Sequence, residues 1–139
     1  MVCEALHEER TKPLYNTVIR RIKDCGDNYY LLGGFEAIDK LPVIKVCDLD
    51  DYHSCVEKIE SVFKRDWCDA DWHIICDDDT FIHTENLNSF ISKLPEDNLR
   101  IYCSQLCEES VGIFGGAGIL MNDKTFKLIQ KFVIENGWK

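Results

Sequence analysis

The chain has 139 residues, 45% of them hydrophobic and 11% aromatic, which is enough to bury one core in a single domain over residues 1–139. Its 16 basic and 25 acidic residues give a formal net charge of -9, so the average surface field repels phosphate backbones and we expect no nucleic-acid partner. No run reaches the roughly 20 apolar residues of a membrane-spanning helix, and Met1–Arg10 does not have the pattern of a signal peptide, so we expect no membrane segment or targeting signal within these residues.

Segments with apolar residues at helical intervals alternate along the chain with segments that have them at strand intervals. Pro13 and Gly26 bracket the first helical run, and Gly137 follows the last one, at the positions where these residues begin and end helices. The expected elements, in chain order, are a helix over Thr11–Cys25, strands over Tyr29–Leu32 and Val43–Cys47, a helix that Asp48–Asp51 cap and that runs through Phe63 or a little beyond, a strand over Trp72–Cys76, a short helix over Leu87–Ile91, strands over Leu99–Cys103, Val111–Phe114 and Ile119–Met121, and a helix over Asp123–Asn136. This alternation predicts an α/β fold, a single Rossmann-like domain whose mainly parallel sheet is flanked by helices, with ligand sites at the carboxyl ends of its strands.

Eight cysteines are many for this length, yet they do not form Cys-x-x-Cys pairs with metal spacing. The closest two, Cys103 and Cys107, have three residues between them. Cys47 and Cys76 end apolar runs, where a buried thiol behaves as a small hydrophobic group. We expect mostly reduced cysteines, although the even count leaves disulfides and the redox compartment open.

Three Asp-x-Asp triplets occur in different contexts. Asp69–Asp71 precedes a strand and is expected to be a solvated turn. Asp48–Asp50 follows a strand but opens an amphipathic helix, so helix capping is favoured over metal binding. Asp77–Asp79 directly follows the most apolar strand, where three adjacent carboxylates repel one another unless a cation lies between them. Asp77–Asp79 is therefore the strongest candidate site.

Carboxylate oxygens at Asp77–Asp79 favour Mn²⁺ or Mg²⁺, which take further ligands from substrate phosphates. Such an ion would neutralise the charge that develops on a departing nucleoside diphosphate. Phe81 argues against two other acidic motifs, because an EF-hand needs an oxygen ligand at that position and an aspartate-nucleophile phosphatase needs a small β-branched residue. The alternative is an unliganded acidic loop in an unrelated α/β domain.

The run Gly115-Gly116-Ala117-Gly118 consists of small residues that let a ligand or another backbone approach closely. By itself such a run is typical of a bulge or tight turn, and no Gly-Lys-Ser/Thr follows that would make it a phosphate loop. In combination with Asp77–Asp79 it is a candidate for the second half of one site.

These motifs resemble two segments of the Fringe-like and core 1 β1,3-galactosyltransferase-type glycosyltransferases, which have an A-type α/β fold. Residues Asp71–Ile82, followed by Glu85–Leu87, are similar to the segment around the family's metal motif. Phe114–Gly118, followed by the helix start Asp123–Phe126, is similar to the family's glycine-rich segment. The resemblance runs from about residue 43 to residue 128, more than half of the chain.

The resemblance implies that Asp77 and Asp79 bind the metal ion, with Asp79 as the direct Mn²⁺ ligand, and that Asp78 faces the donor sugar or its ribose. The residues implied to line the sugar pocket are Gly115, Gly116 and Ala117. The family transfers a sugar from a UDP donor to a hydroxyl of another sugar or a protein-linked glycan, with inversion, and an acidic residue is the general base on the acceptor. The Golgi lumen is the compartment that the resemblance implies.

Parts of the family's pattern are not found in the chain. The family's general base and a metal-binding histidine come well after the glycine-rich segment, and this chain ends at Lys139, one helix later. The first nucleotide-binding strand is also not evident, because Met1–Arg10 is polar. We therefore expect either a partial domain without its carboxyl-terminal catalytic segment or a catalytically inactive nucleotide- or sugar-binding module. His83, near the aspartates, is a further candidate for ligand contact, with a half-exposed surface position as the default.

Overall fold

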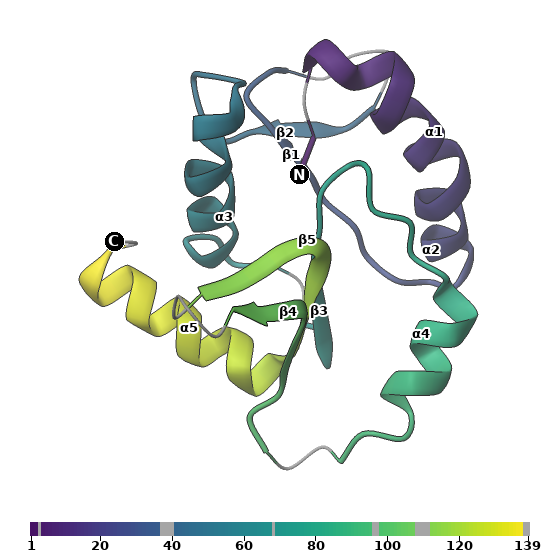
Figure 1. Cartoon of the computed structure of the whole chain (residues 1–139), viewed down its shortest axis with the longest axis vertical. Helices are drawn as coiled ribbons and strands as arrows, with labels where there is room; N and C mark the ends of the chain where they lie inside the picture. The colour runs from purple at the N-terminus through teal and green to yellow at the C-terminus, as the bar shows by residue number, and fades with distance from the viewer. Residues whose placement is uncertain (3, 37–40, 68, 96–97, 108–111, 138–139) are drawn as a thin grey trace.

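The computed structural model describes all residues except 3, 37–40, 68, 96–97, 108–111 and 138–139 (Figure 1). The first helical segment covers residues 4–24 and combines 3₁₀, π and α turns; its α-helical parts are α1 (Lys12–Leu14) and α2 (Arg20–Asp24). The remaining elements are the helices α3 (Cys55–Phe63), α4 (Thr84–Ile91) and α5 (Asp123–Asn136), and the strands β1 (Leu31–Gly33), β2 (Val43–Lys45), β3 (Trp72–Ile75), β4 (Ile101–Cys107) and β5 (Gly112–Asn122).

The predicted helices are confirmed in type, although their ends differ by up to a few turns. The first helical segment starts earlier than expected, near Glu4, and Pro13 lies within its short α1. The last helix, α5, begins where the Asn122 side chain accepts a hydrogen bond from the Thr125 amide. It ends as expected at Gly137, which has φ 73° and donates its amide to the Val133 carbonyl, a conformation that glycine adopts without steric cost.

The strands form two separate sheets. β1 and β2 pair in parallel, with Leu31 opposite Val43. The other sheet has the order β3-β5-β4, and both of its pairings are antiparallel. Only four residues separate β4 from β5, too few for the crossover that a parallel pair requires.

The fold therefore combines helices and sheets, as predicted, but a single mainly parallel sheet is not confirmed. Among the described residues parallel pairing is limited to β1 and β2. The sequence shows that residues 101–121 favour strands, but strand propensity carries no information on strand direction.

Two apolar clusters hold the layers together. In the first, α3 and α5 cover β3 and β5, and the rings of Phe63 and Phe126 lie 5.3 Å apart beside the fully buried Met121. The second joins the helical segment at Ile19 to β1 at Leu31. Figure 1 shows α3 and α5 on one side of the molecule, with the first helical segment and α4 on the other.

Five cysteines within the described part of the chain are free thiols, namely Cys25, Cys47, Cys55, Cys76 and Cys103. Within the same described part of the chain, no helix combines the length and apolar character that crossing a bilayer requires.

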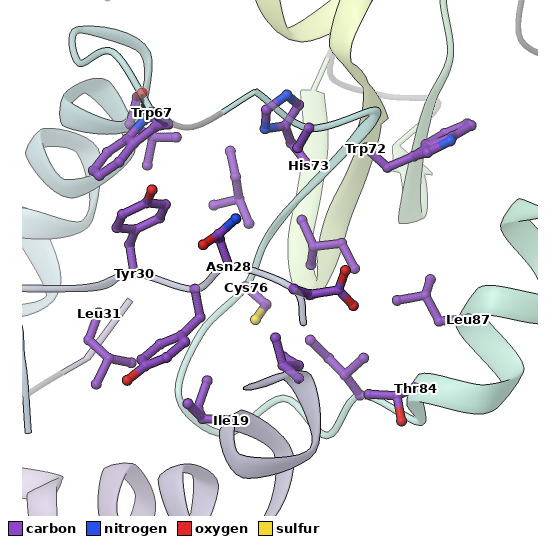
Figure 2. A pocket seen from close by; sticks show the side chains of 18 of the residues that line it. Ile19, Asn28, Tyr30, Leu31, Trp67, Trp72, His73, Cys76, Thr84 and Leu87 are labelled. Atoms are coloured by element: carbon purple, nitrogen blue, oxygen red, sulfur yellow. Dashed lines mark hydrogen bonds between the residues drawn. The ribbon is translucent and has the colours of Figure 1, made fainter. Parts of the chain in front are cut away.

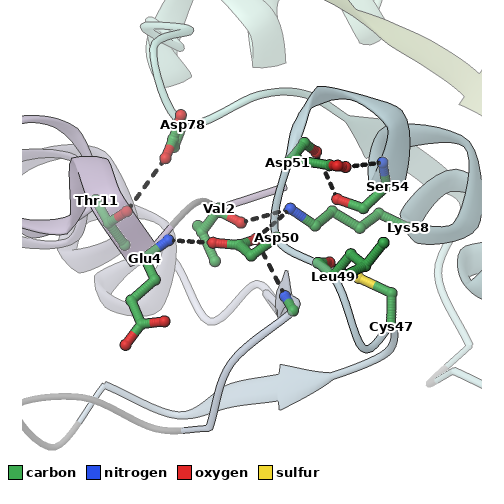
Figure 3. A network of polar contacts seen from close by, with 11 residues as sticks. Val2, Glu4, Thr11, Cys47, Leu49, Asp50, Asp51, Ser54, Lys58 and Asp78 are labelled. Atoms are coloured by element: carbon green, nitrogen blue, oxygen red, sulfur yellow. Dashed lines mark hydrogen bonds and ion pairs between the residues drawn. The ribbon is translucent and has the colours of Figure 1, made fainter.

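A buried ion pair between Asp50 and Lys58 connects three parts of the fold (Figure 3). The Lys58 Nζ lies 2.6 Å from Asp50 Oδ1, and the two side chains are only 4% and 14% exposed. Lys58 also donates to the Val2 carbonyl, and Asp50 accepts from the backbone amides of Glu4 and Gly34. The pair thus joins α3 to the amino-terminal residues and to the end of β1.

Charge and hydrogen bonding act in opposition to burial in this pair. Burial by itself would raise the pKa of Asp50, but the hydrogen bond from Lys58 and those from the two amides outweigh it and lower the pKa. Burial would lower the pKa of Lys58, but its bond to Asp50 outweighs that effect and raises the pKa. Asp50 therefore has a buried structural role, and its neighbour Asp51 accepts a hydrogen bond from the Ser54 amide at 2.9 Å, just before α3.

We predict that Lys58→Met lowers the free energy of unfolding by about 3–5 kcal/mol, because it leaves the Asp50 carboxylate buried without its ammonium partner. Denaturant unfolding at pH 7 measures the loss. The control is Lys64→Met, since Lys64 pairs with Glu60 at 2.8 Å but is 50% exposed, and we expect a change below about 1 kcal/mol.

The pH dependence tests the cause of that loss. A carboxyl group with a lowered pKa stabilises the fold above its ordinary pKa, and this contribution is lost as the pH falls through the folded-state value. The difference between the wild type and Lys58→Met should therefore narrow below about pH 4. A difference that stays constant down to pH 2 would contradict an electrostatic role.

Candidate functional site

The chain turns sharply after β3, and the three aspartates of the strongest sequence candidate form this turn, here called the acidic turn (Asp77–Thr80). The Thr80 amide donates to the Asp77 carbonyl at 3.2 Å, which closes the turn. Within it, Asp78 is buried, Asp79 is exposed and Asp77 is half-buried. The three carboxylates therefore lie in different environments, although they are adjacent in the sequence.

Two residues of the first helical segment bind the acidic turn. The buried Thr11 hydroxyl donates to Asp78 Oδ2 at 3.2 Å, as Figure 3 shows. Arg10 Nη1 lies 3.0 Å from Asp79 Oδ2 and 4.0 Å from Asp78 Oδ1. The Arg10–Asp79 pair is open to solvent, with side chains 42% and 53% exposed, so water and salt screen it. The turn thus already has a cationic partner, and that partner is exchangeable.

Asp77 is half-buried beside two like charges. Burial raises its pKa, and the like charges of Asp79 and Asp78 raise it further, while the amino group of Met1 and the ammonium of Lys58 act in the opposite direction. The Met1 amino group also donates to the carbonyl of Cys76, immediately before the turn. A cation placed near Asp77 would relieve this repulsion.

The glycine-rich segment reaches the acidic turn through one residue that the structure describes, Gly118. In the β3–β5 pairing Ile119 lies opposite Ile75, so Gly118 is next to Cys76. Gly118 has φ 94°, and a Cβ atom there would lie 3.2 Å from the Cys76 Cβ and 3.3 Å from the Ile75 carbonyl oxygen. This backbone conformation favours glycine, and a larger residue there would also be tight against Cys76.

The rest of the predicted sugar pocket is only partly described. Gly115, Gly116 and Ala117 lie within β5, but their surroundings are outside what the structure describes. Of the two motifs, the structure therefore brings together Gly118 and the residues that lead into Asp77, and it leaves open the positions of the other three small residues relative to the aspartates.

The acidic turn fits a metal ion only as part of a shared ligand set. Over the residues that the structure describes, no three His, Cys, Asp or Glu side chains converge as a metal cluster would. Mg²⁺ and Mn²⁺ are nevertheless bound in many sites by one or two protein carboxylates, with substrate phosphates and water completing the shell. Two carboxylates match that partial donor set. Asp79 is exposed and its partner is a solvent-screened arginine, and Asp77 is repelled by the neighbouring carboxylates.

Each of the other acidic and histidine candidates lies either on the surface or in a structural contact. The Asp48 side chain is 99% exposed, with its Oδ1 3.7 Å from Lys45 Nζ, whereas Asp50 belongs to the buried pair described above. In the Asp69–Asp71 triplet, the Asp71 carbonyl accepts from the Asp123 amide at the start of α5. His83 caps α4, because its side chain accepts a hydrogen bond from the Asn86 amide, and its Nδ1 lies 3.2 Å from Glu85 Oε2. Its side chain is 53% exposed, which is the surface position expected by default.

Sequence reasoning missed Arg10 and Thr11, the two residues that hold the acidic turn. They lie in a polar segment far from the aspartates along the chain, and no local pattern distinguishes them from ordinary helix-surface residues. Only the packing of the helical segment brings them to the turn.

A cavity of about 680 Å³ adjoins the site (Figure 2). It lies between residues 28–32, which lead into β1, and residues 72–77, which form β3 and the start of the acidic turn. Tyr30 and Trp67 pack against each other at one end, with ring centroids 4.3 Å apart and ring planes tilted by 45°, and Figure 2 shows Trp72 and Leu87 at the other end.

Comparisons with known proteins leave the site to be interpreted from its own geometry: no family model, no curated protein and no solved structure matches the chain.

With Mn²⁺ as the probe cation, we predict that Arg10→Gln tightens binding by up to about fivefold, because it removes the guanidinium that competes for Asp79 and an exposed pair is worth at most about 1 kcal/mol. Electron paramagnetic resonance of unbound Mn²⁺ measures the affinity. The control is Arg20→Gln, which removes the same charge from an exposed position on the same helical segment. An equal gain in both variants would show that only net charge matters.

Proposed function

We propose that the chain is the metal-dependent donor-binding part of an inverting glycosyltransferase, which transfers a sugar from a UDP-sugar to a hydroxyl of a glycan or protein-linked sugar. The observation that carries this proposal is the contact of Gly118 with Cys76 beside the acidic turn. Gly118 ends one of the two motifs that resemble the family's donor site, and Cys76 directly precedes the other, so this contact supports the proposal.

In this proposal each residue of the turn has a separate task. Asp79 and Asp77 would hold Mn²⁺ or Mg²⁺, which supplies charge neutralisation on the departing diphosphate when it is bound. Asp78 accepts a hydrogen bond from Thr11, and in this proposal it faces the donor sugar or its ribose. The residues proposed to line the sugar pocket are Gly115, Gly116 and Ala117.

The finer fold belongs to the same proposal. A Rossmann-like A-type glycosyltransferase domain over residues 1–139, with its sheet mainly parallel, would have β1, β2 and β3 in one layer and the acidic turn at the carboxyl end of β3. The position of the turn directly after β3 supports this arrangement. A Golgi or secretory location is proposed on the family resemblance alone.

A second candidate is a catalytically inactive relative that binds a nucleotide or sugar. It is favoured by the Arg10–Asp79 pair, because a guanidinium that occupies the metal-binding carboxylate lowers the affinity for the ion. Such a relative would bind the donor at the same site as the enzyme but would not transfer the sugar.

We predict that UDP binds in the presence of Mn²⁺, and that Asp79→Ala and Asp77→Ala each abolish the binding measured by titration calorimetry. The matched control is Asp48→Ala, which removes a carboxylate from an equivalent Asp-x-Asp triplet at a 99% exposed position and should leave UDP binding unchanged. Hydrolysis or transfer assays with UDP-sugars then separate the enzyme from the inactive relative. If a folded wild-type protein shows no Mn²⁺-dependent UDP binding, the proposed function is wrong.

A further inference from the structure

The cavity of about 680 Å³ beside β3 is largely separate from the proposed donor site. Of the described residues assigned to that site, only Asp77 lines the cavity. Cavities that hold small organic ligands have volumes of about 300–1,000 Å³. β3 forms one wall and spans four residues, which is a length of about 13 Å. The cavity therefore has room for an elongated small molecule, and its lining determines the chemistry of that molecule.

Two carboxylates lie at the end of the cavity where β3 begins, and they are here called the acidic rim (Asp69 and Asp71). Both residues are exposed, and among the described residues their side chains form no hydrogen bond or ion pair. A third carboxylate, Asp27, also lines the cavity, whereas no lysine or arginine belongs to the described lining. The ammonium of Lys127 is close enough to Asp69 to interact with its charge, but its direct partner is Asp123, 2.7 Å away. The acidic rim therefore favours a ligand that brings its own positive charge.

Aromatic rings line the cavity next to the acidic rim. Tyr30 lies against Trp67 with ring centroids 4.3 Å apart, as Figure 2 shows, and Tyr30 is 44% exposed, so part of its ring remains accessible. The Trp67 indole nitrogen donates to a carbonyl of α3 at 2.6 Å, which holds the pair in place. Tyr29 is also in the lining, and Lys23 Nζ lies 5.9 Å from the centroid of its ring. Because the faces of aromatic rings attract cations, this wall and the acidic rim favour the same class of ligand group.

Beyond the acidic rim, apolar side chains from three parts of the fold line the cavity. Ile74 belongs to β3, Ile19 to the first helical segment and Leu87 to α4. Ile74 is 37% exposed although it lies within a strand, so apolar surface remains for a ligand to cover. Past the far end of β3, the Met1 amino group lines the cavity and donates to the Cys76 carbonyl. Its positive charge disfavours a second cationic group there, so the charge of a ligand belongs at the acidic rim.

We propose that this cavity binds an organic cation, namely a quaternary or protonated amine carried on an elongated apolar body. The ammonium group lies at Asp69 and Asp71, beside the rings of Tyr30 and Trp67, and the apolar body extends along Ile74. Charge complementarity carries the proposal, because the acidic rim adds to the field of a chain whose formal net charge is -9. The site goes beyond the proposed function, since none of these residues is assigned to UDP or to the metal ion.

The first test compares three probes that have the same apolar body and differ in charge: n-octyltrimethylammonium, n-octanol and octanoate. Each is titrated into the full chain without UDP or Mn²⁺, and two-dimensional amide NMR measures both the affinity and the location. We expect the ammonium probe to bind at least about fivefold more tightly than either control, with the signals of Tyr30 and Ile74 shifting together. Equal affinity for octanol and the ammonium probe, shifts centred elsewhere, or no binding by the folded protein would each overturn the proposal.

The second test removes the charge or the ring while the cavity keeps its apolar lining. Asp69→Asn combined with Asp71→Asn should weaken the ammonium probe about fivefold and leave octanol unchanged. The control combines Asp48→Asn with Asp66→Asn, which removes the same charge from exposed residues outside the lining and should leave both affinities unchanged. Tyr30→Leu should weaken the ammonium probe, whereas Tyr30→Phe keeps the ring and should bind as the wild type does.

Equal weakening by the two aspartate pairs would show that only net charge matters, and it would overturn the proposal. The amide spectrum of each variant shows whether the fold is intact, and the aspartate variants change only exposed side chains. Because UDP and Mn²⁺ are absent, failure of this site leaves the proposed donor site untouched, and failure of the donor site leaves this one untouched.

Discussion

The antiparallel pairing of β5 with β3 is the constraint on which both the core and the site depend. Its register places Ile119 opposite Ile75 and Met121 opposite His73. Met121 then lies at the centre of the main apolar cluster, and α5 follows directly from the end of β5 to cover it with Phe126. The same register brings Gly118 against Cys76. A shift of one residue would move Met121 to the opposite face of the sheet, out of this cluster, and would move Gly118 away from Cys76.

Acidic residues fix the first helical segment at two separate points. Asp50 binds the backbone near Glu4 and the ammonium of Lys58, and the acidic turn binds Arg10 and Thr11. The first point is buried and structural, whereas the second includes an ion pair that is exposed to solvent and screened by it. In a chain with a formal net charge of -9, local basic groups thus determine which carboxylates stabilise the fold and which remain accessible to a ligand.

Local sequence signals predicted the elements well and their assembly less well. Apolar periodicity located β1, β3 and α5, and Gly137 marked the end of α5, because these signals act over a few residues. The direction of β4 and β5 depends on long-range pairing and was not predictable from strand propensity.

The role of Asp50 was missed for a similar reason: a carboxylate at the start of a helix normally suggests a cap, and its buried partner, Lys58, looks like a surface residue on an amphipathic helix. For the site, the sequence predicted that the glycine-rich segment meets the aspartates, and the structure describes this segment's approach at Gly118 beside Cys76. The contacts of Arg10 and Thr11 with the aspartates were not predicted, because they arise only from tertiary packing.

The central claim is that Asp77–Asp79 is the place where the chain binds a divalent cation, and paramagnetic broadening by Mn²⁺ tests it most directly. A two-dimensional amide NMR spectrum of the protein is recorded while substoichiometric Mn²⁺ is added, with UDP present to complete the ligand shell. Our account predicts that signals of the acidic turn and of Gly118 broaden first, and that those around Asp48 remain sharp. Broadening centred on Asp48, or uniform weak broadening over all exposed carboxylates, would contradict it.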